Sequence, residues 1–129
     1  MTVAGIDTAA ESPERVAEYT IQTLERTVPS SVPGITFLSG GLSEEDASIF
    51  LNTMNQRERK GPWSVTFSFS RAMQSSTLKY WGGKPENVEK AQAQLLARAR
   101  ANSEAQQGIY KPGSQPSDQA SLYVKNYQY

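Results

Sequence analysis

Hydrophobic residues recur at helical spacing in four segments of the chain. Ser12 caps the first predicted helix, Pro13 suits its first turn, and Pro29 ends it. Ser43 caps the second, the third begins at Arg71, and the fourth runs from Pro85 to about Gln106. The predicted apolar stripes contain Ala17, Ile21, Leu24 and Val28, then Ala47, Phe50, Leu51 and Met54, then Met73, Thr77, Tyr80 and Trp81, and finally Val88, Ala91, Leu95 and Ala99.

Two shorter segments have the pattern of strands. Residues 35–39 form a mostly apolar, β-rich run, which is typical of a strand buried on both faces. Residues 64–70 alternate small polar with large apolar side chains, which is the period of a strand. Strands that alternate with helices predict an α/β fold with a parallel sheet.

Two parallel strands are too few for a sheet that stands alone, and a parallel barrel needs about 250 residues. The 129-residue pattern therefore predicts part of a larger α/β domain. We expect residues 1–106 to form a partial barrel domain. Residues 107–129, rich in Gln, Ser, Pro, Gly and Tyr, are expected to form a flexible C-terminal tail.

Composition removes several kinds of chemistry. The chain has no cysteine and no histidine, so thiolate nucleophiles, histidine bases and the usual zinc ligands are excluded. Thirteen basic residues balance thirteen acidic ones, which gives no general attraction to nucleic acid or to an anionic membrane. No run of apolar residues is long enough to span a bilayer. We therefore expect a cytoplasmic protein without nucleic-acid or membrane partners.

Polar and glycine residues follow each predicted strand. Ser39-Gly40-Gly41 could admit an anion close to the backbone, or could be only a tight turn. Ser68 lies near the end of the second predicted strand and Arg71 follows it, where Arg71 could bind phosphate or could be a surface arginine. Because ligands bind at the carboxyl ends of parallel strands, the two groups together predict a site for a phosphorylated small molecule.

Other charged residues are interpreted as structural. Glu44-Glu45-Asp46 are expected to be an acidic first turn that complements the helix dipole rather than a metal cluster. Arg98 is expected on an ordinary polar helix face, and Lys79, Lys84 and Lys90 are expected to be solvated.

Several motifs in order resemble class I fructose-bisphosphate aldolases over nearly the whole length. Residues 34–41, followed by Ser43-Glu44-Glu45, resemble one signature of that family. Pro62-Trp63 to Arg71-Ala72, Trp81-Gly82-Gly83-Lys84 with Glu86-Asn87, Ala101-Asn102-Ser103 and the terminal Tyr129 are similar to further family segments.

This resemblance implies the C-terminal portion of a (β/α)8 TIM barrel, strands seven and eight with their helices, plus the tail. The family cleaves fructose 1,6-bisphosphate reversibly into dihydroxyacetone phosphate and glyceraldehyde 3-phosphate through a lysine Schiff base, without metal or other cofactor. It implies that Ser39, Gly40, Gly41, Ser68 and Arg71 bind the phosphorylated sugar and that Tyr129 is catalytic, assisting proton transfer at the enamine carbon. It also implies a homo-oligomer, a tetramer in this family.

The chain departs from the family pattern at several positions. Met1 aligns with the methionine of the family's Lys-Pro-Asn-Met stretch, so the Schiff-base lysine is expected to lie outside this chain. The chain alone is therefore predicted to be inactive. Ser70 stands where the family usually has glycine, and Leu42 stands where it usually has glutamine.

Two other functions fit the same residues. The chain could be a non-catalytic relative that binds a phosphosugar or a protein partner. It could instead be a small α/β phosphate-binding module, which would use the same Ser39 and Arg71 contacts.

Overall fold

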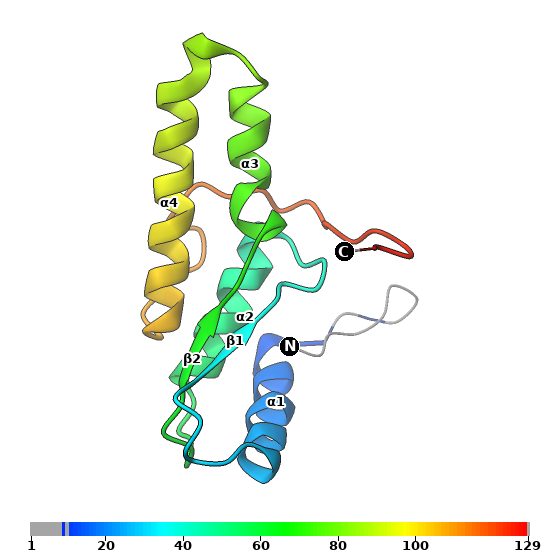
Figure 1. Ribbon diagram of the computed structural model, residues 1–129, viewed down its shortest axis with the longest axis vertical. Coiled ribbons are helices and arrows are strands. Elements are labelled where there is room, and N and C mark those ends of the chain that lie inside the picture. The colour runs from blue at the N-terminus through cyan, green and yellow to red at the C-terminus, as the bar shows by residue number, and fades with distance from the viewer. Residues whose placement is uncertain (1–8, 10, 129) are drawn as a thin grey trace.

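Two parallel strands with helices between and after them organise the structure, a computed structural model that describes residue 9 and residues 11–128 (Figure 1). The catalytic residue expected from the sequence, Tyr129, lies outside the described residues, as does Met1. The elements follow the predicted order: α1 (Pro13–Thr27), β1 (Gly34–Phe37), α2 (Glu44–Gln56), β2 (Ser64–Phe67), α3 (Arg71–Trp81), a 3-10 turn η1 (Pro85–Asn87) and α4 (Val88–Gln106).

The predicted helix starts are confirmed at two serine caps. The Ser12 side chain accepts a hydrogen bond from the Arg15 amide at 3.3 Å, and Pro13 occupies the first turn of α1. The Ser43 side chain accepts from the Asp46 amide at 3.0 Å at the start of α2. Each serine oxygen satisfies an amide that has no partner within its helix.

Both strands are shorter than predicted. They pair in register from Gly34 opposite Ser64 to Phe37 opposite Phe67. The first strand was expected to reach Ser39 and the second to reach Ser70, so both boundaries are corrected. The chain leaves β1 in a turn in which the Leu42 amide donates to the Ser39 carbonyl at 3.2 Å. One further bond, from the Ser68 amide to the Phe37 carbonyl at 2.8 Å, holds the two strand ends together.

The hydrophobic core lies between the strands and the helices α1, α2 and α4. The predicted stripe of α2 is fully confirmed, since its four members are buried. In α1, Ala17 and Ile21 are buried, as predicted, and Leu24 packs against the core. The buried cluster consists of Ala17, Ile21, Ala47, Leu51, Met54, Val65, Phe69, Ala72, Ala101, Ala105 and Tyr110.

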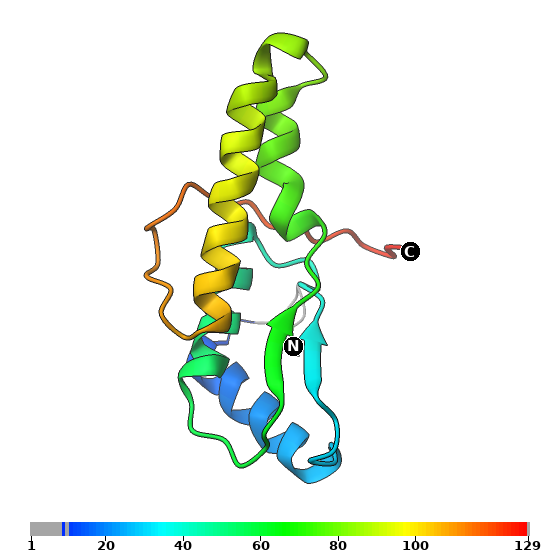
Figure 2. The ribbon, with the colours of Figure 1, turned by 60° about the vertical axis from the view of Figure 1, so that its left-hand side comes forward.

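The predicted stripes of α3 and α4 are confirmed only in part. Met73 of α3 packs against the core and Ala91 of α4 is buried. Tyr80 and Trp81 of α3 are exposed, as are Val88 and Leu95 of α4. The two helices form a hairpin that projects beyond the carboxyl ends of the strands, so their distal halves have little to pack against except each other (Figures 1 and 2). The buried face of α4 is instead Ala91, Gln94, Arg98, Ala101, Asn102 and Ala105.

Residues 107–128, which we call the tail, run from the end of α4 along α2 and then across the carboxyl ends of the strands (Figure 2). Tyr110 near its start is buried. The Gln56 side chain donates to the Gly108 carbonyl at 3.1 Å. The structure thus gives the tail a path with defined contacts, while the division at residue 106 and the mobility of the tail stay predictions.

In the part of the chain that the structure describes, no helix has both the length and the apolar character needed to cross a membrane.

Candidate functional site

The turn after β1 has the backbone geometry that its two glycines allow. Gly40 has a φ of 63° and Gly41 a φ of 88°, a left-handed region that residues with side chains rarely adopt. Ser39 is half-buried and Gly40 is exposed, so the start of this turn faces solvent. A Cβ built on Gly40 would meet nothing within 4 Å, which leaves open space beside it.

The loop after β2 places the second group of predicted residues beside this turn. Ser68 is exposed and directly follows the paired part of β2. Arg71 begins α3 and is half-buried. Since the strands are parallel neighbours, both loops lie at one edge of the sheet, as the sequence predicts.

The tail crosses this edge and contacts both loops. The Leu122 amide donates to the Gly41 carbonyl at 3.0 Å, and the Arg71 guanidinium donates to the Leu122 carbonyl. The Arg71 guanidinium carbon also lies 4.2 Å from the centre of the Tyr127 ring, within the range of a cation–π contact. The structure therefore connects Gly41 and Arg71 through one tail residue, Leu122.

Ser70 does not need the conformational freedom of glycine. Its φ is −99°, outside the left-handed region, so a side chain is compatible with this backbone. Ser70 makes no side-chain cap for α3.

A buried ionic cluster lies under the tail, and the sequence interpretation missed it. Glu44, Glu45 and Asp46 form the first turn of α2, as predicted. Glu44 and Arg98 are fully buried and Glu45 is 6% exposed, so the ordinary polar helix face expected for Arg98 is wrong. Arg98 Nε lies 3.8 Å from Glu44 Oε2, and Arg98 Nη1 lies 4.0 Å from Glu45 Oε2. Arg98 Nη2 also donates at 2.7 Å to both the Glu44 carbonyl and Ser48 Oγ.

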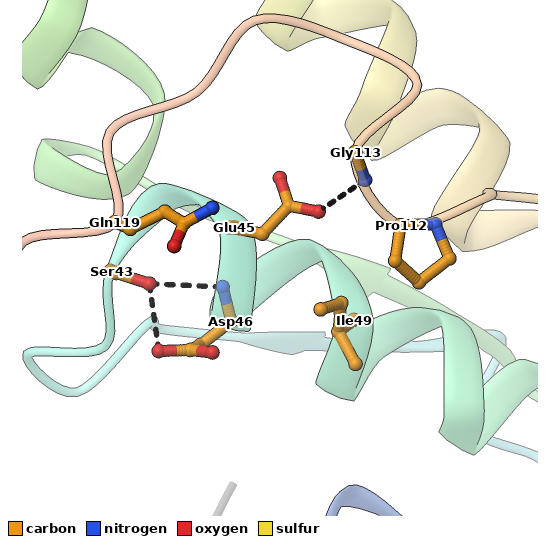
Figure 3. Close-up of a pocket in the computed structure, with 7 residues that line it drawn as sticks. All are labelled: Ser43, Glu45, Asp46, Ile49, Pro112, Gly113 and Gln119. Carbon is orange, nitrogen blue, oxygen red and sulfur yellow. Dashed lines mark hydrogen bonds between the residues drawn. The ribbon is translucent and has the colours of Figure 1, made fainter.

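The tail supplies the hydrogen bonds of Glu45. Tyr110 Oη lies 2.9 and 3.0 Å from the two carboxylate oxygens. The Gly113 amide donates at 2.8 Å (Figure 3) and Ser117 Oγ at 2.7 Å. Burial raises the pKa of the Glu45 carboxyl, but these hydrogen bonds and the charge of Arg98 outweigh it and hold the pKa below its ordinary value.

Glu44 has a different set of donors. Its Oε1 accepts from the Ser76 amide at 2.9 Å and from Ser76 Oγ at 3.0 Å, both in α3. Its Oε2 accepts from the Asp118 amide of the tail at 2.9 Å. The two carboxylates therefore join α2, α3, α4 and the tail.

A cavity of about 310 Å³ lies between the first turn of α2 and the tail (Figure 3). Its lining includes Glu45 and Asp46 from α2, and Gly113 and Gln119 from the tail. Across residue 9 and residues 11–128 no group of three or more His, Cys, Asp or Glu side chains could hold a metal ion, so the acidic turn offers no such group.

Comparison with known proteins decides the family. Residues 1–129 match the family model described as fructose-bisphosphate aldolase class-I. The chain belongs to this family. It is 54% identical over 131 residues to "Fructose-bisphosphate aldolase 6, cytosolic" of Arabidopsis thaliana, and 55% identical over 126 residues to the cytoplasmic isozyme of Spinacia oleracea.

The alignments cover nearly all of this chain but only part of each relative. All of this chain aligns with the Arabidopsis aldolase but only 37% of that protein is covered, and the corresponding shares for the spinach isozyme are 97% and 35%. The chain therefore spans about a third of the length of the curated relatives it matches, in their C-terminal part.

A solved aldolase has the same fold in this region. It is the Plasmodium falciparum fructose-bisphosphate aldolase in complex with TRAP and a small-molecule inhibitor, with a TM-score of 0.81 and 51% identity. The alignment covers 85% of this chain and 32% of that one. The two parallel strands and their helices are thus part of an aldolase (β/α)8 barrel, which confirms the predicted fold class.

Proposed function

We propose that this chain supplies the phosphate-binding strand ends and the tail of an aldolase that cleaves fructose 1,6-bisphosphate reversibly through a Schiff base. One observation carries this proposal: the Gly40-Gly41 turn and Arg71 lie at the adjoining carboxyl ends of two paired parallel strands. This is the edge at which barrel enzymes bind phosphate. Membership of the aldolase family supplies the reaction.

Each proposed contact follows from the chemistry of its residue. The Arg71 guanidinium is a planar fork of donors that matches phosphate oxygens. The glycine backbone lets phosphate approach Gly40 closely, because no side chain stands there. Ser39 and Ser68 add hydroxyl donors to the phosphate or the sugar. The aldolase resemblance gives Tyr129 the proton transfer at the enamine carbon.

The carbon–carbon bond cleavage itself needs a Schiff-base lysine, and we assign that role to no lysine of this chain. We therefore propose that the 129-residue chain binds phosphosugar without cleaving it, while the complete aldolase cleaves it. Binding by the complete aldolase with no cleavage would favour the non-catalytic alternative.

The assembly and the location of the complete protein are proposed by the same route. We propose a homo-oligomer, a tetramer by family resemblance, in the cytoplasm, as the names of the plant relatives state for those proteins. The α3–α4 hairpin exposes the large apolar side chains Leu78, Trp81 and Leu96. Contact with another subunit would bury this apolar surface, which supports an oligomer. Light scattering of the complete protein tests the proposal, and a monomer contradicts it.

A calorimetric titration of the 129-residue chain with fructose 1,6-bisphosphate tests the site. We expect binding that Arg71→Ala weakens about tenfold or more, because a hydrogen bond to a charged group contributes about 1.5–3 kcal/mol. Arg100→Ala is the matched control, since Arg100 is an exposed arginine on α4. Equal binding by both variants would contradict the proposed site.

A further inference from the structure

The buried cluster carries more negative than positive charge. Two carboxylates, Glu44 and Glu45, face one guanidinium, that of Arg98, and all three are at least nine-tenths buried. A buried charge is tolerated only when it is paired and hydrogen-bonded. The start of α2 offers partial compensation through the helix dipole. The rest of the buried negative charge must be stabilised by hydrogen-bond donors around the carboxylates.

For Glu45, those donors come from the tail. Among the described residues, every hydrogen bond to its carboxylate is donated by Tyr110, Gly113 or Ser117. Figure 3 shows the Glu45 carboxylate directed at the Gly113 amide, with Gln119 passing beside Ser43. Detaching the tail would therefore leave a carboxylate in a largely enclosed site without these donors, which makes detachment costly.

The position of this cluster determines how the tail reaches the strand ends. Leu122 lies sixteen positions after Gln106, the last residue of α4, but only four positions after Asp118. Asp118 is held by Glu44, and Leu122 is held at Gly41. The local concentration of a tethered group falls roughly as the −3/2 power of tether length. A tether of four rather than sixteen residues therefore favours docking of Leu122 by about eightfold.

We propose that Glu44 and Glu45, held by Arg98, are the positioning residues that anchor the tail and thereby hold Leu122 at Gly41 and Arg71. The anchor is a structural claim about residues 110–122 and holds whether or not the chain binds a phosphosugar. Its consequence for catalysis, the delivery of Tyr129 to the site, rests on the proposed function.

Amide hydrogen exchange on the full 129-residue chain tests the anchor. Ser117→Ala removes one donor to Glu45, and Ser114→Ala is its control, because Ser114 is an exposed serine of the same segment. We expect Ser117→Ala to speed exchange of the Leu122 amide relative to Ser114→Ala, by less than the roughly eightfold that complete loss of the Asp118 attachment would give, because the bond from Asp118 to Glu44 remains. Exchange of the buried Leu51 amide should be equal in the two variants.

Three further variants keep the result interpretable. Tyr110→Phe removes the other side-chain donor to Glu45 and should also release Leu122. Glu45→Gln retains an acceptor oxygen without the charge and should release it less than Glu45→Ala. Equal protection of Leu122 in Ser117→Ala, Tyr110→Phe and Ser114→Ala would overturn the anchor. That outcome would leave the proposed phosphosugar site intact, because the site is tested separately by titration.

Discussion

The guanidinium of Arg71 donates a hydrogen bond to the backbone carbonyl of Leu122. The residue proposed to bind phosphate is thus held by the tail in this structure, and the Tyr127 ring covers its guanidinium. A phosphate that takes the Nη1 donor of Arg71 competes with the Leu122 carbonyl for it. Phosphosugar binding and tail docking are therefore coupled, and each should weaken the other.

We expect Tyr127→Leu to tighten binding of fructose 1,6-bisphosphate by about two- to fivefold, because it removes a cation–π contact of roughly 0.5–1 kcal/mol from Arg71. Tyr123→Leu is the matched control, since both tyrosines belong to the tail and are exposed, at 44% and 47%. Titration calorimetry measures both affinities. Weaker binding in Tyr127→Leu would mean that the ring assists the ligand rather than competing with it.

The two glycines after β1 make different contacts with the tail. A Cβ on Gly41 would lie 3.1 Å from the Tyr123 Cα, whereas a Cβ on Gly40 would meet nothing within 4 Å. Both residues have positive φ, so alanine at either position should cost about 1 kcal/mol of stability.

Only Gly41→Ala should also displace the tail. We expect faster exchange of the Leu122 amide in Gly41→Ala than in Gly40→Ala, at similar midpoints of urea unfolding. If the two variants released Leu122 equally, backbone strain rather than contact with Tyr123 would be the cause.

Local signals in the sequence predicted the elements that depend on them. Ser12 and Ser43 cap helices where expected, because a capping side chain acts on an amide only three residues away. The stripe of α2 is buried as predicted, since this helix packs on the sheet and on the three helices α1, α3 and α4. The glycines at residues 40 and 41 mark the turn after β1, because its positive φ angles favour glycine.

Long-range contacts could not be predicted in the same way. Arg98 and Glu44 are 54 residues apart, and Tyr110 bonds to a carboxylate 65 residues earlier. Periodicity assigns Arg98 to a polar face because it registers charge but not the partners that allow a charge to be buried. The sequence does hold one signal: Tyr110 is an aromatic residue near the start of a largely polar tail, and burial of such a ring would dock the tail, although the sequence does not say where.

Removing the buried cation should cost more stability than removing an exposed one. Arg98→Leu leaves Glu44 and Glu45 without their charged partner, and breaking a buried ion pair in this way costs about 3–5 kcal/mol. Arg100→Leu, the same substitution on the exposed face of α4, should change stability by less than about 0.5 kcal/mol. Urea unfolding followed by circular dichroism measures both. Similar unfolding midpoints would show that the cluster does not need Arg98.

Acid should release the tail through Glu45. Because the folded state holds the pKa of Glu45 below its ordinary value of 4.5, the ionised carboxylate stabilises the docked tail above that pH. This contribution is lost as pH falls from about 4.5 through the lowered pKa of the folded state. The charged and titratable groups that contact Glu45 include Arg98 and Tyr110, and the pKa of Tyr110 is raised by burial and by its hydrogen bond to Glu45.

We expect protection of the Leu122 amide, corrected for intrinsic exchange, to decrease below pH 4.5 in the unmodified chain. Glu45→Gln carries no titratable group at this position, so its protection should be lower at neutral pH and should change less with acid. Asp118 is a second acid in the tail, and its pKa is lowered by its hydrogen bond from Lys79. Asp118→Asn is therefore measured alongside. If the acid response disappears in Asp118→Asn but persists in Glu45→Gln, its cause is the exposed Lys79–Asp118 pair and not Glu45.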